Sequence, residues 1–119
     1  MVVDFYWYPN CSTCKKAKAT LENQGISYRA IDLKSTPPTS EQFQEWFAQA
    51  DFPVNKFFNT SGLVYRDLNL KDQMATLTDQ EKADLLSANG MLVKRPLLVK
   101  NGKVEQIGFK AEAYEQIKK

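Results

Sequence analysis

Short apolar runs and amphipathic stretches alternate along the chain, and their order predicts an α/β protein. Val2 to Tyr8 is rich in β-branched and aromatic residues, which predicts a mostly buried strand. Good helix formers follow from Ser12 to Gln24, and Gly25 stands where such a helix would end. Ile26 to Leu33 alternates as a second strand. Because a helix separates the two strands, a parallel βαβ unit is the natural inference.

The middle of the chain predicts helices rather than strands. Thr39–Gln42 and Thr78–Glu81 both fit the capping-box pattern that begins a helix. We expect the second of these helices to end at Asn89-Gly90 in a left-handed stop. Between the two helices, Pro53 to Asp72 carries short apolar clusters broken by small residues, which indicates short helices and loops.

The last part of the chain predicts a hairpin and a helix. Asn101-Gly102 lies between the strand-like runs Leu97–Lys100 and Lys103–Ile107, a strong hairpin signal. Lys110 to Lys119 has apolar residues at helical offsets. The order βαβ, helices, ββα is the thioredoxin arrangement: a mixed four-stranded sheet with a helical insertion between the second and third strands. We expect residues 1–119 to form one domain of this α/β class.

Composition and charge narrow the classes of protein. Apolar residues make up 43% and charged residues 25% of the 119 residues, as in ordinary globular proteins. The net charge of +2 comes from basic and acidic residues spread along the chain, so direct nucleic-acid binding is not expected. No apolar run is long enough for a membrane span, and the N-terminus has no secretion signal. We therefore expect a soluble cytoplasmic protein with no membrane partner.

The candidate chemistry lies in the two cysteines, Cys11 and Cys14, which stand between the first strand and the first helical turn. In a cytosolic α/β protein this spacing is typical of a redox site. Unpaired N–H groups at a helix N-terminus carry partial positive charge and favour a thiolate. Cys11 stands at or before the N-cap, and Cys14 lies one turn inside the helix. We interpret Cys11 as the nucleophile and Cys14 as the resolving cysteine.

Other roles for the cysteines fit this sequence less well. A structural disulfide across four residues closes almost no loop and stabilises little. A zinc site needs four ligands, and the chain has no histidine and no third cysteine. The lack of histidine also excludes a Cys-His hydrolase. A third interpretation, in which both cysteines are inert buried thiols, is not excluded by the sequence. The nearby Lys15, Lys16 and Lys18 either help the thiolate modestly or form a solvated helix face.

Three segments together resemble the arsenate reductase (ArsC) family, in the branch that also contains the Spx-type transcription regulators. They are Tyr8–Ala17, Asp32–Pro38 and Lys94–Val99. The resemblance covers essentially the whole chain and implies a thioredoxin-like fold. It implies further that Cys11 attacks an oxyanion or a disulfide, that Pro96 is a cis proline facing the cysteines, and that Arg95 points to the same site.

The resemblance is less specific for the substrate. Arsenate reductases bind their oxyanion with three arginines, whose guanidinium groups suit that geometry. Arg95 matches one of them. The other two positions read Asn59 and Ile107–Phe109, without arginine. Arg95 itself has a second reading, in which it pairs with a surface carboxylate.

Three functions follow from these observations. The first is a thiol-dependent reductase without a bound cofactor or metal, re-reduced by thioredoxin, glutaredoxin or glutathione. The second is a Spx-like redox-sensing regulator that binds RNA polymerase, and the third is an adaptor with vestigial cysteines. Spx-type regulators extend beyond the last helix, whereas this chain ends at Lys119, so the sequence leans to the enzyme. The substrate, electron donor, reduction potential and oligomeric state stay open.

Overall fold

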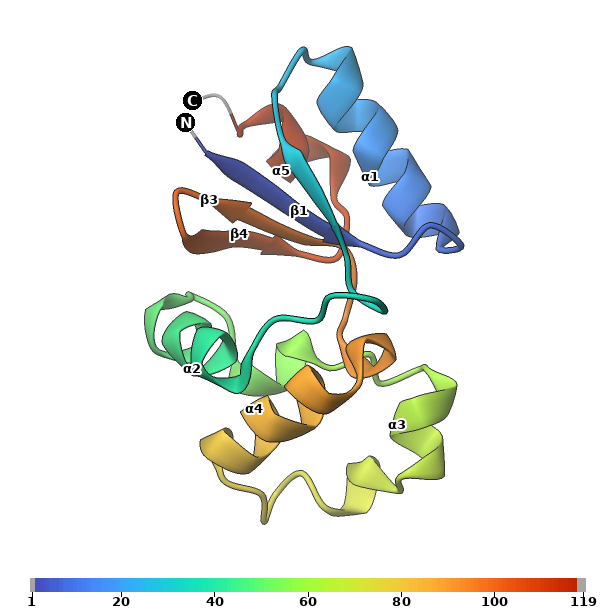
Figure 1. Ribbon diagram of the computed structural model, residues 1–119, viewed down its shortest axis with the longest axis vertical. Coiled ribbons are helices and arrows are strands. Elements are labelled where there is room, and N and C mark those ends of the chain that lie inside the picture. Colours follow the sequence, from blue (N-terminus) through green and yellow to red (C-terminus); the bar gives the residue numbers. More distant parts are fainter. Residues whose placement is uncertain (1, 118–119) are drawn as a thin grey trace. The chain divides into compact units, whose positions relative to one another are not determined.

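The computed structural model describes residues 2–117, and the chain forms two compact units (Figure 1). The sheet unit comprises the residues up to Asp32 and those from Arg95 onward. The helical unit is the intervening segment, Leu33–Lys94. The predicted helical insertion between the second and third strands is therefore confirmed. The expectation of one domain over residues 1–119 stays a prediction.

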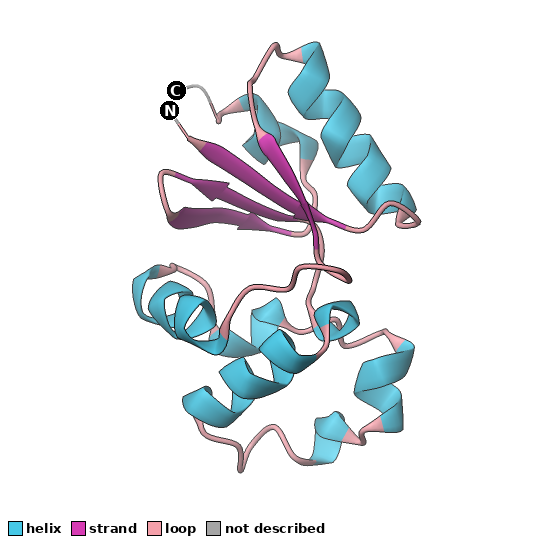
Figure 2. Ribbon diagram, in the orientation of Figure 1, coloured by secondary structure: helices cyan, strands magenta, loops and turns pink. Residues whose placement is uncertain are grey.

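The sheet unit contains a four-stranded mixed sheet in the order β2-β1-β3-β4 (Figure 2). Its strands are β1 (Val3–Trp7), β2 (Arg29–Asp32), β3 (Leu97–Lys100) and β4 (Lys103–Ile107). β1 runs parallel to β2 and antiparallel to β3, and β3 pairs antiparallel with β4. The predicted thioredoxin-like α/β arrangement is confirmed.

The hairpin between β3 and β4 forms where the sequence predicts it. Asn101 and Gly102 both have positive φ, 52° and 83°, as a type I′ turn requires. The turn also reaches back to the start of the chain: the Asn101 N–H donates to the Val2 carbonyl at 2.7 Å, and the Val2 N–H donates to the Asn101 side chain at 2.8 Å. A register shift leaves Glu105 without a partner on β3, which is a β-bulge.

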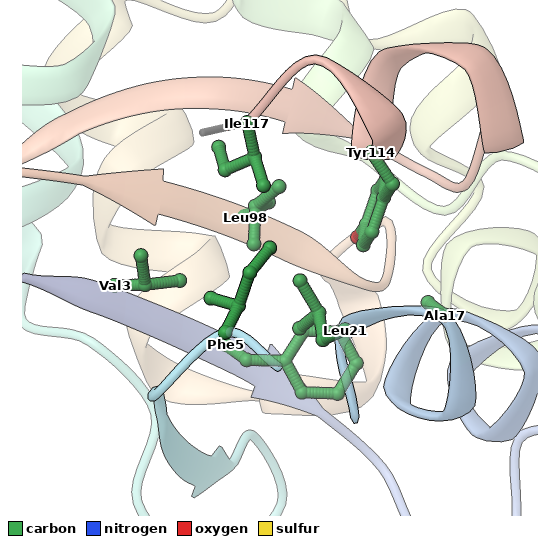
Figure 3. Close-up of a cluster of buried hydrophobic side chains, with 8 residues drawn as sticks. Val3, Phe5, Ala17, Leu21, Leu98, Tyr114 and Ile117 are labelled. Carbon is green, nitrogen blue, oxygen red and sulfur yellow. The ribbon is translucent and has the colours of Figure 1, made fainter. Parts of the chain in front are cut away.

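One face of this sheet is covered by helices α1 (Ser12–Asn23) and α5 (Ala111–Glu115), whose apolar side chains meet those of β1 and β3 (Figure 3). Burying side chains of this size stabilises a fold by roughly 1.5–3 kcal/mol each. α5 is shorter than the predicted helix over 110–119, and positions 118–119 lie outside the described residues. The cluster consists of Val3, Phe5, Ala17, Leu21, Ile26, Leu98, Tyr114 and Ile117.

The second strand is shorter than predicted, because its first residues close α1 instead. Gly25 adopts φ 69°, and the Ile26 N–H donates to the Leu21 carbonyl at 3.1 Å, as in a Schellman motif. Ile26 is then buried against the core. The strand begins only at Arg29, so the predicted helix end is confirmed and the predicted strand start is wrong.

The helical unit contains α2 (Ser40–Gln49), α3 (Leu63–Asp67) and α4 (Asp79–Ala88) with the short 3₁₀ helices η1 (Val54–Phe57), η2 (Leu70–Asp72) and η3 (Gly90–Leu92). The predicted helix starts are confirmed. The Thr39 hydroxyl accepts from the Gln42 N–H at 3.1 Å. Thr78 and Glu81 form a complete capping box, with N–H to oxygen distances of 2.9 and 3.1 Å between donor and acceptor atoms.

The predicted left-handed stop at Asn89-Gly90 is wrong. Asn89 is extended, with φ −147°, and its side chain accepts from the Met91 N–H at 3.0 Å, which starts η3. Gly90 is required for another reason: a Cβ atom there would overlap the Leu33 carbonyl group. The glycine therefore permits a close backbone approach and not a positive φ.

None of the helices within residues 2–117 is both long and apolar enough to cross a bilayer.

Candidate functional site

The site begins where β1 ends and α1 starts. Cys11 is the N-cap of α1, with extended backbone angles of φ −93° and ψ 116°. Its N–H donates to the Tyr8 carbonyl at 3.0 Å, and its own carbonyl accepts from the Lys15 N–H at 3.1 Å. These two bonds tie Cys11 to the end of the central strand and to the first helical turn, so its position is fixed from both sides.

The N-terminus of α1 lacks the usual stabilising groups. No side-chain oxygen caps this end, and the first turn contains no acidic residue. The N–H groups of Thr13 and Cys14 instead hydrogen-bond with the Cys11 sulfur. These are the donors that an oxygen-bearing N-cap would ordinarily satisfy. The free N–H groups of the first turn are therefore available to hydrogen-bond with the Cys11 sulfur.

Both cysteines are free thiols, and they differ in exposure. Cys11 is partly exposed, whereas Cys14 has no accessible surface at all. The Cys14 thiol donates a hydrogen bond to the Cys11 sulfur, which favours the thiolate at Cys11 and the protonated form at Cys14. The two side chains therefore behave as a coupled pair with one accessible member.

Several contacts decide the ionisation of Cys11. Partial burial opposes ionisation, but the hydrogen bonds from the Cys14 thiol and N–H, the charge of the Arg95 guanidinium and the Thr13 N–H together lower the pKa of Cys11 below its ordinary value. A larger fraction of Cys11 is therefore thiolate near neutral pH than for a free cysteine. This is the property that a nucleophilic cysteine needs.

Cys14 shifts the other way. Burial raises the pKa of Cys14 to about 12, against a lowering by the Tyr8 main-chain N–H; the bond donated to Cys11 and the Cys11 charge raise it further, and the Arg95 charge lowers it. A buried thiol with this pKa stays protonated and unreactive towards outside reagents. It becomes useful only when an electrophilic sulfur is formed beside it.

Arg95 and Pro96 come to the same site from the start of β3. The Arg95–Pro96 peptide bond is cis, as the family resemblance implies, and Pro96 is buried. Its carbonyl accepts from the Gly108 N–H at 2.9 Å. The Arg95 guanidinium carbon lies 5.6 Å from the centroid of the Tyr8 ring, and its charge acts on both cysteines. All four predicted site residues thus belong to the sheet unit, and three of them interact directly through charge or hydrogen bonds.

The lysines beside the cysteines belong to the surface of helix α1. Lys18 pairs with Glu22 at 2.7 Å and lies 5.6 Å from the centre of the Trp7 ring, so it serves the helix surface. Lys15 and Lys16 are exposed. The positive charge that acts on Cys11 comes from Arg95.

Two tyrosines belong to the site although sequence reasoning missed them. Tyr8 contacts the site through its carbonyl, its N–H and its ring. Tyr114 of α5 is fully buried, its hydroxyl has no hydrogen-bond partner among the described residues, and burial followed by the Cys14 charge raises its pKa. The position of Tyr8 directly before Pro9 was a usable signal, whereas the approach of α5 to Cys14 depends on tertiary packing.

Two further positions that carry arginine in arsenate reductases carry other residues in this chain. Asn59 belongs to the helical unit, where its N–H donates to the Leu92 carbonyl at 2.8 Å. Ile107 ends β4, and Gly108 follows it with φ 83°. Within residues 2–117, moreover, no three His, Cys, Asp or Glu side chains gather as a metal site requires.

Comparison with known proteins places this site in a family. The ArsC family model matches residues 6–117. The uncharacterized protein YusI of Bacillus subtilis is 41% identical over 98% of both chains. The crystal structure of a possible arsenate reductase from Streptococcus mutans is 49% identical over 91% of both chains, with a TM-score of 0.88. The global transcriptional regulator Spx of Listeria innocua is 25% identical over 91% of this chain and 80% of its own length.

Proposed function

We propose that this chain, which belongs to the ArsC family, is a thiol-disulfide oxidoreductase with Cys11 as nucleophile and Cys14 as resolving cysteine. The observation that carries the proposal is the opposite ionisation of two hydrogen-bonded thiols. The pKa of the accessible Cys11 is lowered, and that of the enclosed Cys14 is raised to about 12. One thiol is prepared to attack, and the other is withheld until it is needed.

The reaction proceeds in two exchanges. The Cys11 thiolate attacks one sulfur of a substrate disulfide, forms a mixed disulfide and expels the other substrate sulfur as a thiolate. Cys11 then carries no negative charge, so the hydrogen bond from the Cys14 thiol to the Cys11 thiolate no longer holds the Cys14 proton in place. Cys14 loses that proton to the leaving thiolate or to water and attacks the Cys11 sulfur. The second substrate thiolate leaves, and a Cys11–Cys14 disulfide holds the two electrons' worth of oxidation.

The oxidised protein must then be reduced from outside. A dithiol such as thioredoxin or glutaredoxin, or two molecules of glutathione, would supply the two electrons by the same exchange chemistry. The proposal needs no bound cofactor and no metal. Arg95 stabilises negative charge on sulfur throughout, since its guanidinium is always ionised.

Disulfides fit this site better than arsenate does. Arsenate is a multiply charged oxyanion, and its recognition calls for several guanidinium groups. In this chain, Asn59 and the Ile107–Phe109 stretch stand at the other two family positions, and Arg95 alone is retained. A single cation suits a thiolate, which carries one charge. Arsenate is therefore the comparison substrate in the test, and not the expected one.

The deciding experiment is steady-state turnover with a thioredoxin system supplying electrons from NADPH. A small aromatic disulfide and arsenate are offered separately to the wild-type protein and to Cys14→Ser. We expect turnover of the disulfide by the wild type, while Cys14→Ser accumulates the mixed disulfide at Cys11, detected by intact mass. Lack of turnover with both substrates would contradict the enzyme.

A redox switch is the second candidate, favoured by similarity to the regulator Spx over 91% of this chain and 80% of that protein. In that case the same Cys11–Cys14 disulfide would report oxidation, and the partner would be RNA polymerase. A pull-down of RNA polymerase with the reduced and the oxidised protein tests this. Polymerase binding that depends on the disulfide, combined with no turnover of either substrate, would establish the switch and remove the enzyme.

A further inference from the structure

Tyr8 contacts both cysteines and the arginine of the site. Its carbonyl accepts from the Cys11 N–H at 3.0 Å, and its N–H hydrogen-bonds with the Cys14 sulfur. Its ring lies against the Arg95 guanidinium, with 5.6 Å from the guanidinium carbon to the ring centroid. The main chain and the side chain of one residue thus meet both cysteines and the cation.

The ring contact answers a physical problem of the site. Arginine has a long flexible side chain, and a guanidinium that swings into solvent exerts only a screened charge on sulfur. A planar guanidinium stacks readily on an aromatic face, which limits its freedom while its N–H edge stays available. The Asn10 side-chain amide donates to the Tyr8 hydroxyl at 3.3 Å and bears on the orientation of that ring.

We propose that Tyr8 is the positioning residue of this site: its ring holds the Arg95 guanidinium beside the Cys11 sulfur, while its main chain aligns the two cysteines. The inference rests on the proposed function, since it assigns Tyr8 a part in activating the nucleophile Cys11. Tyr8 transfers no proton and forms no bond with the substrate. It acts through Arg95.

The test measures the ionisation of Cys11 directly. The rate of alkylation by iodoacetamide is followed from pH 4 to pH 10, with the modified residue identified by peptide mass. The variants are Tyr8→Leu, Tyr8→Phe, Arg95→Gln and the double variant Tyr8→Leu/Arg95→Gln. Tyr65→Leu is the matched control, because Tyr65 packs on Phe58 in the helical unit.

We expect Tyr8→Leu to raise the apparent pKa of Cys11 and to slow its alkylation at pH 6 by about threefold, with Arg95→Gln acting in the same direction. Tyr8→Phe keeps the ring and should stay close to wild type, as should Tyr65→Leu. The double variant should be no slower than Arg95→Gln alone, because the ring has no other route to the thiolate.

Two results would overturn the inference. One is a Cys11 pKa in Tyr8→Leu that equals the wild-type value while Arg95→Gln raises it. The other is multiplication of the two effects in the double variant, which would show that Tyr8 does not act through Arg95. Far-ultraviolet circular dichroism and thermal unfolding identify a misfolded Tyr8→Leu, and Tyr8→Met then serves in its place. Because alkylation needs no substrate, failure of the turnover assay leaves this test intact.

Discussion

Helices α2 and α4 of the helical unit begin differently from α1 of the sheet unit. In the helical unit, α2 and α4 start at Thr39 and Thr78, whose hydroxyls accept from main-chain N–H groups, and acidic residues stand in both first turns. In the sheet unit, α1 starts at Cys11 with no oxygen cap and no acidic residue in its first turn. The same backbone donors are thus satisfied by oxygen at the starts of α2 and α4 and directed at sulfur at the start of α1.

The difference separates stability from chemistry. A threonine cap stabilises a helix by about 1 kcal/mol, and a nearby carboxylate adds to this through the helix dipole. A carboxylate near Cys11 would cancel the field that favours its thiolate. Helix α1 therefore has a less stable start than α2 and α4, and the pKa of its Cys11 thiol is lowered. The apolar cluster beneath α1 stabilises this helix in place of a cap.

The largest expected effect comes from giving α1 an ordinary cap. Cys11→Ser should abolish thiol exchange, because a serine hydroxyl is not ionised near neutral pH. The same change should raise the free energy of unfolding by roughly 0.5–1 kcal/mol, since serine is among the best N-cap residues. Turnover and urea denaturation of the reduced protein measure the two effects.

A matched variant shows whether the gain in stability belongs to the cap. Cys11→Ala also removes the thiol but offers no oxygen to the N–H groups of the first turn. It should be inactive without being stabilised. Equal stability of the serine and alanine variants would contradict the view that α1 lacks a cap.

The two thiols of this uncapped turn should differ strongly in reactivity. Cys14 has a pKa of about 12 and Cys11 a pKa below the ordinary value of 9.0. At pH 7 the thiolate fraction of Cys14 should therefore be far smaller than that of Cys11, in addition to the difference in exposure. Iodoacetamide should modify Cys11 along a titration curve that rises with pH and is centred below the free-thiol value. Modification of both residues at similar rates near pH 7 would refute the assigned roles.

Two glycines extend the comparison to the backbone of each unit. Gly90→Ala in the helical unit places a Cβ into the Leu33 carbonyl group, so the backbone must move, and we expect a loss of roughly 2–4 kcal/mol. Gly25→Ala in the sheet unit meets no atom within 4 Å but is held at φ 69°. Its loss should be about 1–2 kcal/mol, the cost of a left-handed alanine. Urea denaturation decides the order, and a larger loss at Gly25 would contradict it.

The smallest effect should come from removing a cap in the helical unit. Thr78→Ala breaks the capping box with Glu81, and we expect a loss of about 1 kcal/mol. The alkylation profile of Cys11 should not change, because this cap belongs to the other unit. A shift in the apparent pKa of Cys11 in this variant would show that helix capping and thiol ionisation are not separate.

The sequence was most informative where the signal is local. Thr78 with Glu81 predicted a helix start and Asn101-Gly102 predicted the hairpin, and both are present. These features depend on residues close together in the chain. Their stereochemistry therefore follows from the sequence itself.

The sequence was less informative where distant segments decide. Gly90 looked like a left-handed stop, but the Leu33 carbonyl determines its role. Ile26 is β-branched and lies in a predicted strand, yet its N–H bonds to the last turn of α1 and its side chain is buried in the core. The effect of the Cys14 charge on Tyr114 likewise depends on the packing of α5. Such contacts join segments far apart in the chain, and the spacing of apolar residues within one segment does not predict them.

The order in which the chain is made gives the split sheet unit a further consequence. Cys11 and Cys14 are synthesised before Arg95 and strand β3, which follow only after the whole helical unit. Until then β1 has no antiparallel neighbour, and Cys11 lacks the cation that lowers its pKa. Cys11 in the nascent chain therefore lacks one of the groups that lower its pKa, and the full site forms only when the sheet unit is complete.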